Sequence, residues 1–163
     1  MEIRHSTEQD IPAMLKIYEK ARAFMAENGN PNQWGPTNWP PEALLHEDIA
    51  SGRSYICEEN GVIGATFVYV YGKDIEPTYL NIEDGAWGKD EPYGVIHRIA
   101  ASGAIKGAAT FCINWAYEKC GYMRIDTHTD NIVMQNLLTK LGFRKTGIIH
   151  VVEDNYPRIA FEK

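Results

Sequence analysis

One strand-turn-helix unit, residues 97–110, has the residue types needed to bind phosphate. Its strand-like start is followed by a serine-glycine turn, and the next helix opens on Gly107, Ala108 and Ala109. A helix N-terminus offers unpaired N–H groups and partial positive charge, and small residues there let a pyrophosphate approach the backbone. Neither a GxxxxGKS/T nor a GxGxxG motif is present. The unit therefore predicts a different kind of phosphate site, although small residues also suit close packing of a helix on a sheet.

A second stretch, residues 123–131, carries alternating polar side chains. Asp126, His128 and Asp130 are two residues apart, so they would share one face of a strand. Carboxylate and imidazole ligands suit several divalent metals, which would make the protein a metal-dependent hydrolase. The stretch offers no obvious fourth ligand and no partner motif. The hydrolase stays an alternative, and no metal is expected.

Apolar periodicity and turn residues predict how the chain positions these two units. The pattern predicts helices, then an Asn-Gly hairpin, then alternating strands and helices. The predicted elements are helices at 11–25 and 42–49, an ordered loop at 32–41, strands at 55–58 and 62–71, a strand or bridge at 78–80, a strand at 93–101, a helix at 107–119, a strand at 123–128, a helix at 131–141, and strands at 147–152 and 158–161.

Size and composition limit the classes of protein to consider. The 163 residues suit one domain, expected to span residues 1–163, and the net charge of −6 argues against a nucleic-acid partner. The cysteines, Cys57, Cys112 and Cys120, form no close pair, which favours a reducing cytosol over a disulfide framework. No signal peptide and no apolar run long enough to cross a bilayer is seen. We expect a cytoplasmic protein that does not use a membrane.

The second stretch resembles motif B of the GNAT N-acetyltransferases, in which a strand leads to Asn and a helix that closes in KLGF. Here these are Asn131 and residues 140–143. The preceding unit resembles motif A, whose signature Gln/Arg-x-x-Gly-x-Gly/Ala falls on residues 104–109. Gly107 and Ala109 match, whereas Ala104 replaces the usual Gln or Arg. The resemblance implies an α/β (α+β) fold with a single GNAT-like domain, in which a mixed central β-sheet is flanked by helices on both faces.

The resemblance also implies acetyl-CoA as co-substrate. The end of the motif A strand would hold the pantetheine, and the turn and helix start would hold the pyrophosphate, with Lys106 standing in for the missing side chain at Ala104. Asn131 and the helix after it would contact the pantetheine or acetyl region. The implied cofactor-binding residues are Ile99, Ala100, Ala101, Lys106, Gly107, Ala108, Ala109, Thr110, Asn131 and Asn136.

The implied reaction is attack of a primary amine on the thioester. An amine near pKa 10 is mostly protonated at neutral pH, so a general base is needed, and His97 and Glu83 are the candidates. A backbone N–H near Ile99 would stabilise the developing oxyanion. Many family members have a Tyr as general acid where this chain has Leu138. Tyr79, Tyr93 and His128 are possible substitutes.

The acceptor is expected to be a small-molecule or peptide amine. Trp34, in the loop between the first two helices, and Glu83, in the acidic segment, are the predicted substrate-binding residues. The family often pairs subunits through C-terminal strands, so a homodimer is expected. A non-catalytic acyl-CoA-binding sensor is the other alternative, suggested by Leu138 and Ala104.

Overall fold

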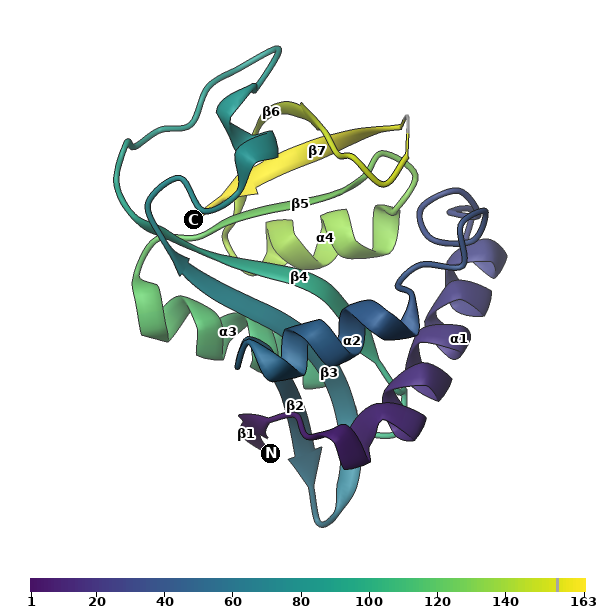
Figure 1. Ribbon diagram of the computed structural model, residues 1–163. Helices are drawn as coiled ribbons and strands as arrows, with labels where there is room; N and C mark the ends of the chain where they lie inside the picture. The colour runs from purple at the N-terminus through teal and green to yellow at the C-terminus, as the bar shows by residue number, and fades with distance from the viewer. Residues whose placement is uncertain (155) are drawn as a thin grey trace.

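The computed structural model describes residues 1–154 and 156–163, in which two β-sheets meet along one line with helices on both faces (Figure 1). The elements are β1 (Glu2–His5), η1 (Glu8–Asp10), α1 (Ile11–Glu27), α2 (Glu42–Ala50), β2 (Ser54–Glu59), β3 (Val62–Gly72), η2 (Pro77–Leu80), β4 (Tyr93–Ala101), α3 (Ala108–Cys120), β5 (Arg124–His128), α4 (Ile132–Lys140), β6 (Arg144–His150) and β7 (Pro157–Glu162).

The two sheets are antiparallel and their junction is parallel. One sheet has the order β1-β2-β3-β4 and the other β5-β7-β6. β4 and β5 meet at the bridge between Gly94 and Met123, where the Gly94 N–H donates to the Tyr122 carbonyl at 2.9 Å. Beyond this point the strands separate toward the side of the molecule where α1 lies (Figure 1). The result is a mixed sheet with a wedge between its two central strands.

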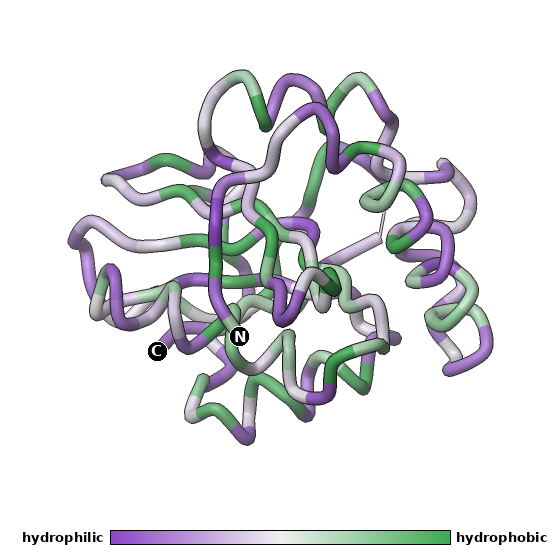
Figure 2. Tube along the Cα trace, turned by 90° about the horizontal axis from the view of Figure 1, so that it is seen from below, coloured by the Kyte–Doolittle hydropathy of each residue, from purple (hydrophilic) through white to green (hydrophobic). Residues whose placement is uncertain are grey.

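Helices cover the two faces because the strands alternate their apolar side chains. Cys57 and Phe67 pack with α3 and α4 in one core cluster, whereas Ile56 packs with α1 and α2 in another. Figure 2 shows hydrophobic segments running through the middle of the molecule, whereas the outer loops and helices carry both hydrophilic and hydrophobic residues. The expected α/β fold, with a mixed sheet and helices on both faces, is therefore confirmed.

A β-bulge interrupts β4 where it leaves β5. Thr66 of β3 pairs with Ala100 and Val68 pairs with His97, so two residues of β4 face one residue of β3. Arg98, inside the bulge, has a φ of 51°, and its carbonyl accepts a hydrogen bond from Tyr18 at 2.8 Å. The extra residue reverses the alternation, so that Ala100 packs toward α1. The bulge thereby directs consecutive side chains of β4 toward the wedge.

Most predicted elements are confirmed, and the strand at 93–101 has the predicted bounds. The strand or bridge predicted at 78–80 is wrong, because the segment forms the 3-10 helix η2. Pro77 suits a helix start, and the Glu76 side chain accepts from the Thr78 N–H, so a local cap outweighs the β propensity of Tyr79. None of the helices in the described ranges is long and apolar enough to span a membrane.

The C-terminal strand β7 lies in the centre of its sheet, between β5 and β6. Residues 83–86 run along the outer edge of β6. Glu83 exchanges two backbone hydrogen bonds with Ile148, both 2.8 Å, and the Ala86 N–H donates to the Thr146 carbonyl. This segment covers part of the edge through which a second copy would pair, and the homodimer stays a prediction.

Candidate active site

Two cavities occupy the wedge between β4 and β5. The polar cavity, about 120 Å³, lies between β4, β5, η2 and the connection from β6 to β7. The apolar cavity, about 270 Å³, lies between α1, the end of β4 and α4. Met25, Ile99, Asn131 and Met134 line both. The two cavities therefore meet at the β4 bulge, where a ligand in one would touch a ligand in the other.

The apolar cavity suits an extended, mostly apolar chain. Phe24 of α1 and Val133 of α4 face each other across it with about half of their surfaces exposed, and Leu137 lines its wall. Residues 99–103 form one side. Exposed apolar side chains around a cavity indicate a ligand with apolar segments.

The N-terminus of α3 lies at one end of this cavity. Gly107 caps the helix with a φ of 81°, and nothing lies within 4 Å of where its Cβ would be. The first hydrogen bond of the helix runs from the Phe111 N–H to the Gly107 carbonyl, so the N–H groups of residues 108–110 have no helical partner. Lys20 donates to the Ser102 carbonyl at 2.7 Å and adds positive charge nearby. This turn can hold a pyrophosphate.

Close packing supports the same turn. A Cβ on Gly64 of β3 would lie 3.0 Å from Ile105 and 3.1 Å from Ala108. The absence of a side chain at Gly64 lets Ile105 pack down and anchor the loop, while Lys106 stays exposed. The small residues therefore do serve close packing, and the turn leaves the N–H groups of residues 108–110 without helical partners, as phosphate binding would require.

Asn131 joins the two cavities. Its Oδ1 accepts the Met134 N–H at 3.0 Å and caps α4, while its Nδ2 donates to Gln33 at 2.9 Å. Asn136, predicted as a cofactor contact, is exposed and lines neither cavity, so its contact with the cofactor stays a prediction. It lies one residue after the buried Gln135, whose amide donates to the Thr129 carbonyl, and so points away from the wedge.

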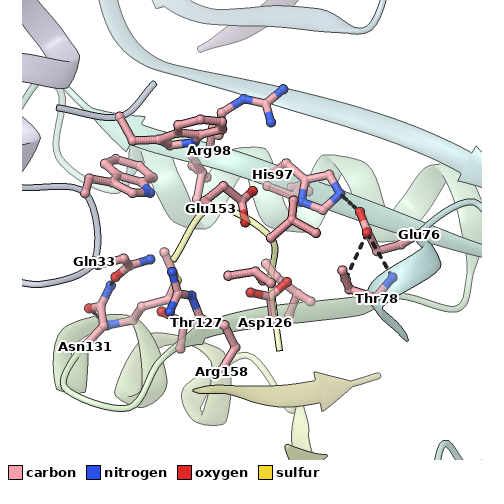
Figure 3. Close-up of a pocket in the computed structure, with 18 of the residues that line it drawn as sticks. Gln33, Glu76, Thr78, His97, Arg98, Asp126, Thr127, Asn131, Glu153 and Arg158 are labelled. Carbon is pink, nitrogen blue, oxygen red and sulfur yellow. Dashed lines mark hydrogen bonds and ion pairs between the residues drawn. The ribbon is translucent and has the colours of Figure 1, made fainter. Parts of the chain in front are cut away.

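In the polar cavity, His97 is held by a carboxylate. Its Nε2 lies 3.0 Å from Glu76 Oε2, and Thr78 Oγ1 donates to the other oxygen of Glu76 at 2.9 Å (Figure 3). Burial alone would raise the pKa of Glu76, but its hydrogen bond with His97 leaves that pKa below the usual value. Among the described residues, Nδ1 of His97 is the ring nitrogen left for a substrate.

Asp126 of β5 faces the same cavity. It accepts a hydrogen bond of 2.6 Å from the hydroxyl of Tyr79, whose ring is buried. Desolvation raises the pKa of Asp126, although His97 nearby opposes the shift. Glu153, from the connection between β6 and β7, also points into the cavity (Figure 3). Asp126 and His97 thus form two proton acceptors on the strands that border the wedge.

Aromatic side chains close the cavity on the side of α1. Trp34 is 8% exposed and packs edge-on against Tyr18, with ring centroids 5.8 Å apart. Trp34 and Trp39 both line the polar cavity. The predicted position of Trp34 beside a substrate is consistent with this arrangement, because it covers the core and also faces the cavity.

Glu83 lies elsewhere, and its predicted place in the site is corrected. Its carboxylate is exposed and lies 3.3 Å from His150 Nε2, on the outer edge of β6, and it lines neither cavity. The acidic segment turns away after η2, so Glu76, seven residues earlier, is the carboxylate that reaches the cavity. The Glu-Pro-Thr sequence, a helix-start pattern, is the signal that could have pointed to it.

The substitutes considered for the missing tyrosine have other contacts. Leu138 is fully buried in the core. Tyr79 donates to Asp126, the Tyr93 hydroxyl accepts from the Glu76 N–H at 3.3 Å, and His128 Nδ1 accepts from the Asp130 N–H at 3.0 Å. The last contact occupies Nδ1 of His128, one of the three residues of the metal alternative. Within residues 1–154 and 156–163, no group of three His, Cys, Asp or Glu side chains is placed to hold a metal ion.

Solved structures of other proteins share this fold. A crystal structure of a GNAT-family acetyltransferase from Streptococcus agalactiae superposes with a TM-score of 0.88 at 28% identity, over 99% of this chain and 94% of the other. A Staphylococcus aureus protein assigned as an acetyltransferase gives 0.72 at 27% identity, over 100% and 98%. A Salmonella typhimurium structure with its cofactor acetyl-CoA gives 0.59 at 17% identity, over 99% and 92%.

Comparisons with models of protein families and with curated proteins found no match. The fold nevertheless defines a class, that of acetyltransferase-type α/β domains, and here β4 is bulged beside an open helix N-terminus. Within that class, the chain belongs to the GNAT superfamily.

Proposed function

We propose that this protein is an N-acetyltransferase that transfers the acetyl group of acetyl-CoA to a primary amine. The observation that carries the proposal is the meeting of two unlike cavities at the β4 bulge. One is apolar and ends at a helix N-terminus, as a pantetheine and its pyrophosphate require. The other is polar and contains His97 held by Glu76. A thioester and an amine would meet at Ile99 and Asn131.

The residues of the turn and of β4 fit acetyl-CoA. The N–H groups of residues 108–110 would bind the pyrophosphate, with Lys20 adding charge, and residues 99–101 would pair with the pantetheine. Acetyl-CoA supplies an acyl group on a thiol, which leaves readily because its pKa is near 8.5. The backbone N–H groups of the bulge are the donors that we assign to the developing oxyanion.

His97 is the general base of the proposed reaction. Nδ1 of His97 takes the proton of the amine as the N–C bond forms and the C–S bond breaks. Glu76 fixes Nε2, and so fixes the ring orientation and stabilises the imidazolium. With Leu138 buried where the family has a tyrosine, the thiolate takes its proton from solvent.

Titration calorimetry with acetyl-CoA tests the cofactor site. The wild type should bind at micromolar concentration. Gly107→Glu should abolish binding, because its carboxylate would occupy the open space at the start of α3 and repel the pyrophosphate. Gly121→Glu is a matched control, since Gly121 has a φ of 69°, caps the other end of α3 and also has nothing within 4 Å of its Cβ position. No binding by the wild type would overturn the proposal.

A non-catalytic acyl-CoA sensor is the second candidate, favoured by Leu138 and Ala104. Release of CoA separates the two functions. With acetyl-CoA and a panel of primary amines, the enzyme releases free thiol in proportion to the amine consumed. A sensor binds acetyl-CoA in the calorimeter and releases none above the background rate.

A further inference from the structure

The charged side chains that line the polar cavity are not all paired with one another. Two arginines line it, and each is already paired with a carboxylate that does not line the cavity. Arg98 lies 2.5 Å from Asp48, which is 1% exposed, and Arg158 lies 2.7 Å from Asp154. Arg158 also donates to the Tyr156 carbonyl. Both arginines are thus engaged by carboxylates outside the cavity, although Asp48 is shared with Arg53, at 2.8 Å, and Arg98 Nε has no hydrogen-bond partner among the described residues.

The three carboxylates of the cavity differ in their hydrogen-bond partners. Glu76 is bound by His97 and Thr78, and Asp126 by Tyr79. Glu153 is different, because its Oε2 is shielded from solvent and has no hydrogen-bond partner among the described residues. A shielded carboxylate oxygen without a donor costs free energy unless a ligand supplies one.

Thr127 is a second acceptor without a partner in the same cavity. Its side chain is 1% exposed, it lines the cavity, and its Oγ1 has no hydrogen-bond partner in the part of the chain that the structure describes. An ammonium group carries three N–H donors and a positive charge. It can donate to both Thr127 Oγ1 and Glu153 Oε2, and its charge makes the hydrogen bond to the carboxylate stronger than one from a neutral donor.

These two groups are not needed by the amine that reacts. In Figure 3, His97 and Glu76 lie on one side of the cavity, Asn131 and Gln33 lie on the other, and Glu153 enters between them. His97, with Asp126 nearby, serves the reacting amine. Glu153 and Thr127 are thus left for another part of the acceptor.

We infer that the acceptor carries a second positive group, held by Glu153 and Thr127, in addition to the amine that is acetylated. The inference rests on the proposed function and names its substrate class: small diamines with a short apolar spacer. The rings of Trp34 and Trp39 would pack against the spacer or the cation. The reacting amine would lie at His97 while the second positive group reaches Glu153 in the same cavity.

A matched series of acceptors tests the inference by CoA release. The compounds are 1,4-diaminobutane, n-butylamine and 4-aminobutanoate, which differ only in the charge at the far end. We expect kcat/KM to be highest for the diamine, about tenfold or more above butylamine, in line with a hydrogen bond to a charged group. This exceeds the statistical advantage of its two equivalent amines. The aminobutanoate should react more slowly than butylamine.

Variants test which residues cause the preference for the diamine over butylamine. Glu153→Gln keeps the side-chain size and removes the charge, and should reduce the ratio of diamine to butylamine kcat/KM about tenfold. Thr127→Val should reduce the same ratio. Glu118→Gln, an exposed carboxylate on α3, removes the same charge far from the cavity and should leave the ratio unchanged. An unchanged ratio in both Glu153→Gln and Thr127→Val overturns the inference.

Failure of the inference and failure of the proposed function give different experimental results. If butylamine is acetylated as well as the diamine, the protein is an acetyltransferase and the inference alone is wrong. If acetyl-CoA neither binds nor yields CoA with any amine, both are wrong. Calorimetry of the diamine against butylamine in the presence of CoA adds a readout without turnover. Equal affinity there also overturns the inference.

Discussion

At the scale of single residues, we predict that substitution of His97 lowers activity strongly and that substitution of Glu83 does not. Both are acids or bases of suitable type in the sequence, but only His97 faces the polar cavity in the structure. His97→Asn should reduce kcat/KM about 10²–10⁴-fold, the usual contribution of a general base, with the acetyl-CoA Kd unchanged. Glu83→Gln should change kcat/KM less than about twofold, because surface substitutions have small effects.

The measurement is steady-state CoA release, with calorimetry of acetyl-CoA as the control for folding and cofactor binding. A His97→Asn variant within tenfold of the wild type would exclude His97 as the base. Asp126, on the other strand that borders the wedge, would then be the next candidate for the base. A large loss in Glu83→Gln would restore the assignment made from the sequence.

At the scale of elements, one buried carboxylate joins the edge strand to the first helix. Asp10, at the start of α1, accepts two hydrogen bonds from Arg4 of β1, at 2.8 and 2.9 Å, and one from the Thr7 N–H at 2.7 Å. The hydrogen bonds from Arg4 outweigh burial and hold the pKa of Asp10 below its usual value. Folding therefore favours the charged form of Asp10.

The sign of the pH dependence follows. A carboxyl group whose pKa is lower in the folded than in the unfolded state stabilises the fold above its unfolded pKa, about 3.9 for Asp. That contribution is lost as the pH falls through the folded pKa. Asp10→Asn should reduce the free energy of unfolding by about 1 kcal/mol at pH 7. The difference from wild type should shrink as the pH falls from about 5 to about 3.

Urea unfolding at pH 7, 5 and 3 measures this difference. Asp90→Asn is the control, because Asp90 is exposed and its contact with Lys73 is 3.5 Å long, so it should show little change at any pH. A constant deficit in Asp10→Asn from pH 7 to pH 3 would mean that shape, and not the charge of Asp10, matters.

Elements also show which parts of the fold a sequence can predict. The strand at 93–101 and the helix at 11–25 have strong apolar patterns, and both form close to the predicted bounds. Segment 78–80 has the β-favouring Tyr79, but the cap from Glu76 and the fixed φ of Pro77 decide its structure. Periodicity reports burial over many residues, whereas a short segment depends on one or two local contacts.

The candidate site likewise has one part that the sequence predicts and another part that it does not. Gly107 and Asn131 are found from sequence because each lies in a local motif whose chemistry is carried by backbone and helix termini. Glu76, Asp126 and Glu153 come from three distant segments. Only tertiary folding brings them together, so no spacing in the sequence predicts their meeting.

At the scale of the whole molecule, the two sheets are tightly joined at one end and open at the other. At the junction, a Cβ on Gly94 would lie 2.6 Å from Cys120 Sγ and 3.0 Å from the Tyr69 ring. Met123 exchanges two backbone hydrogen bonds with Lys163 beside it. At the open end, the strands border cavities instead of each other. A ligand in the wedge would therefore contact both halves of the sheet.

This geometry predicts that acetyl-CoA stabilises the whole fold. A ligand that binds only the folded state at about 100 times its Kd adds about 2.7 kcal/mol to the free energy of unfolding. For a domain of this size, that corresponds to a rise in Tm of about 5–10 °C. Differential scanning calorimetry with and without acetyl-CoA measures the shift. Because binding requires the N-terminus of α3, the rise should be absent in Gly107→Glu and present in Gly121→Glu. An equal rise in both variants would show that acetyl-CoA binds away from that turn.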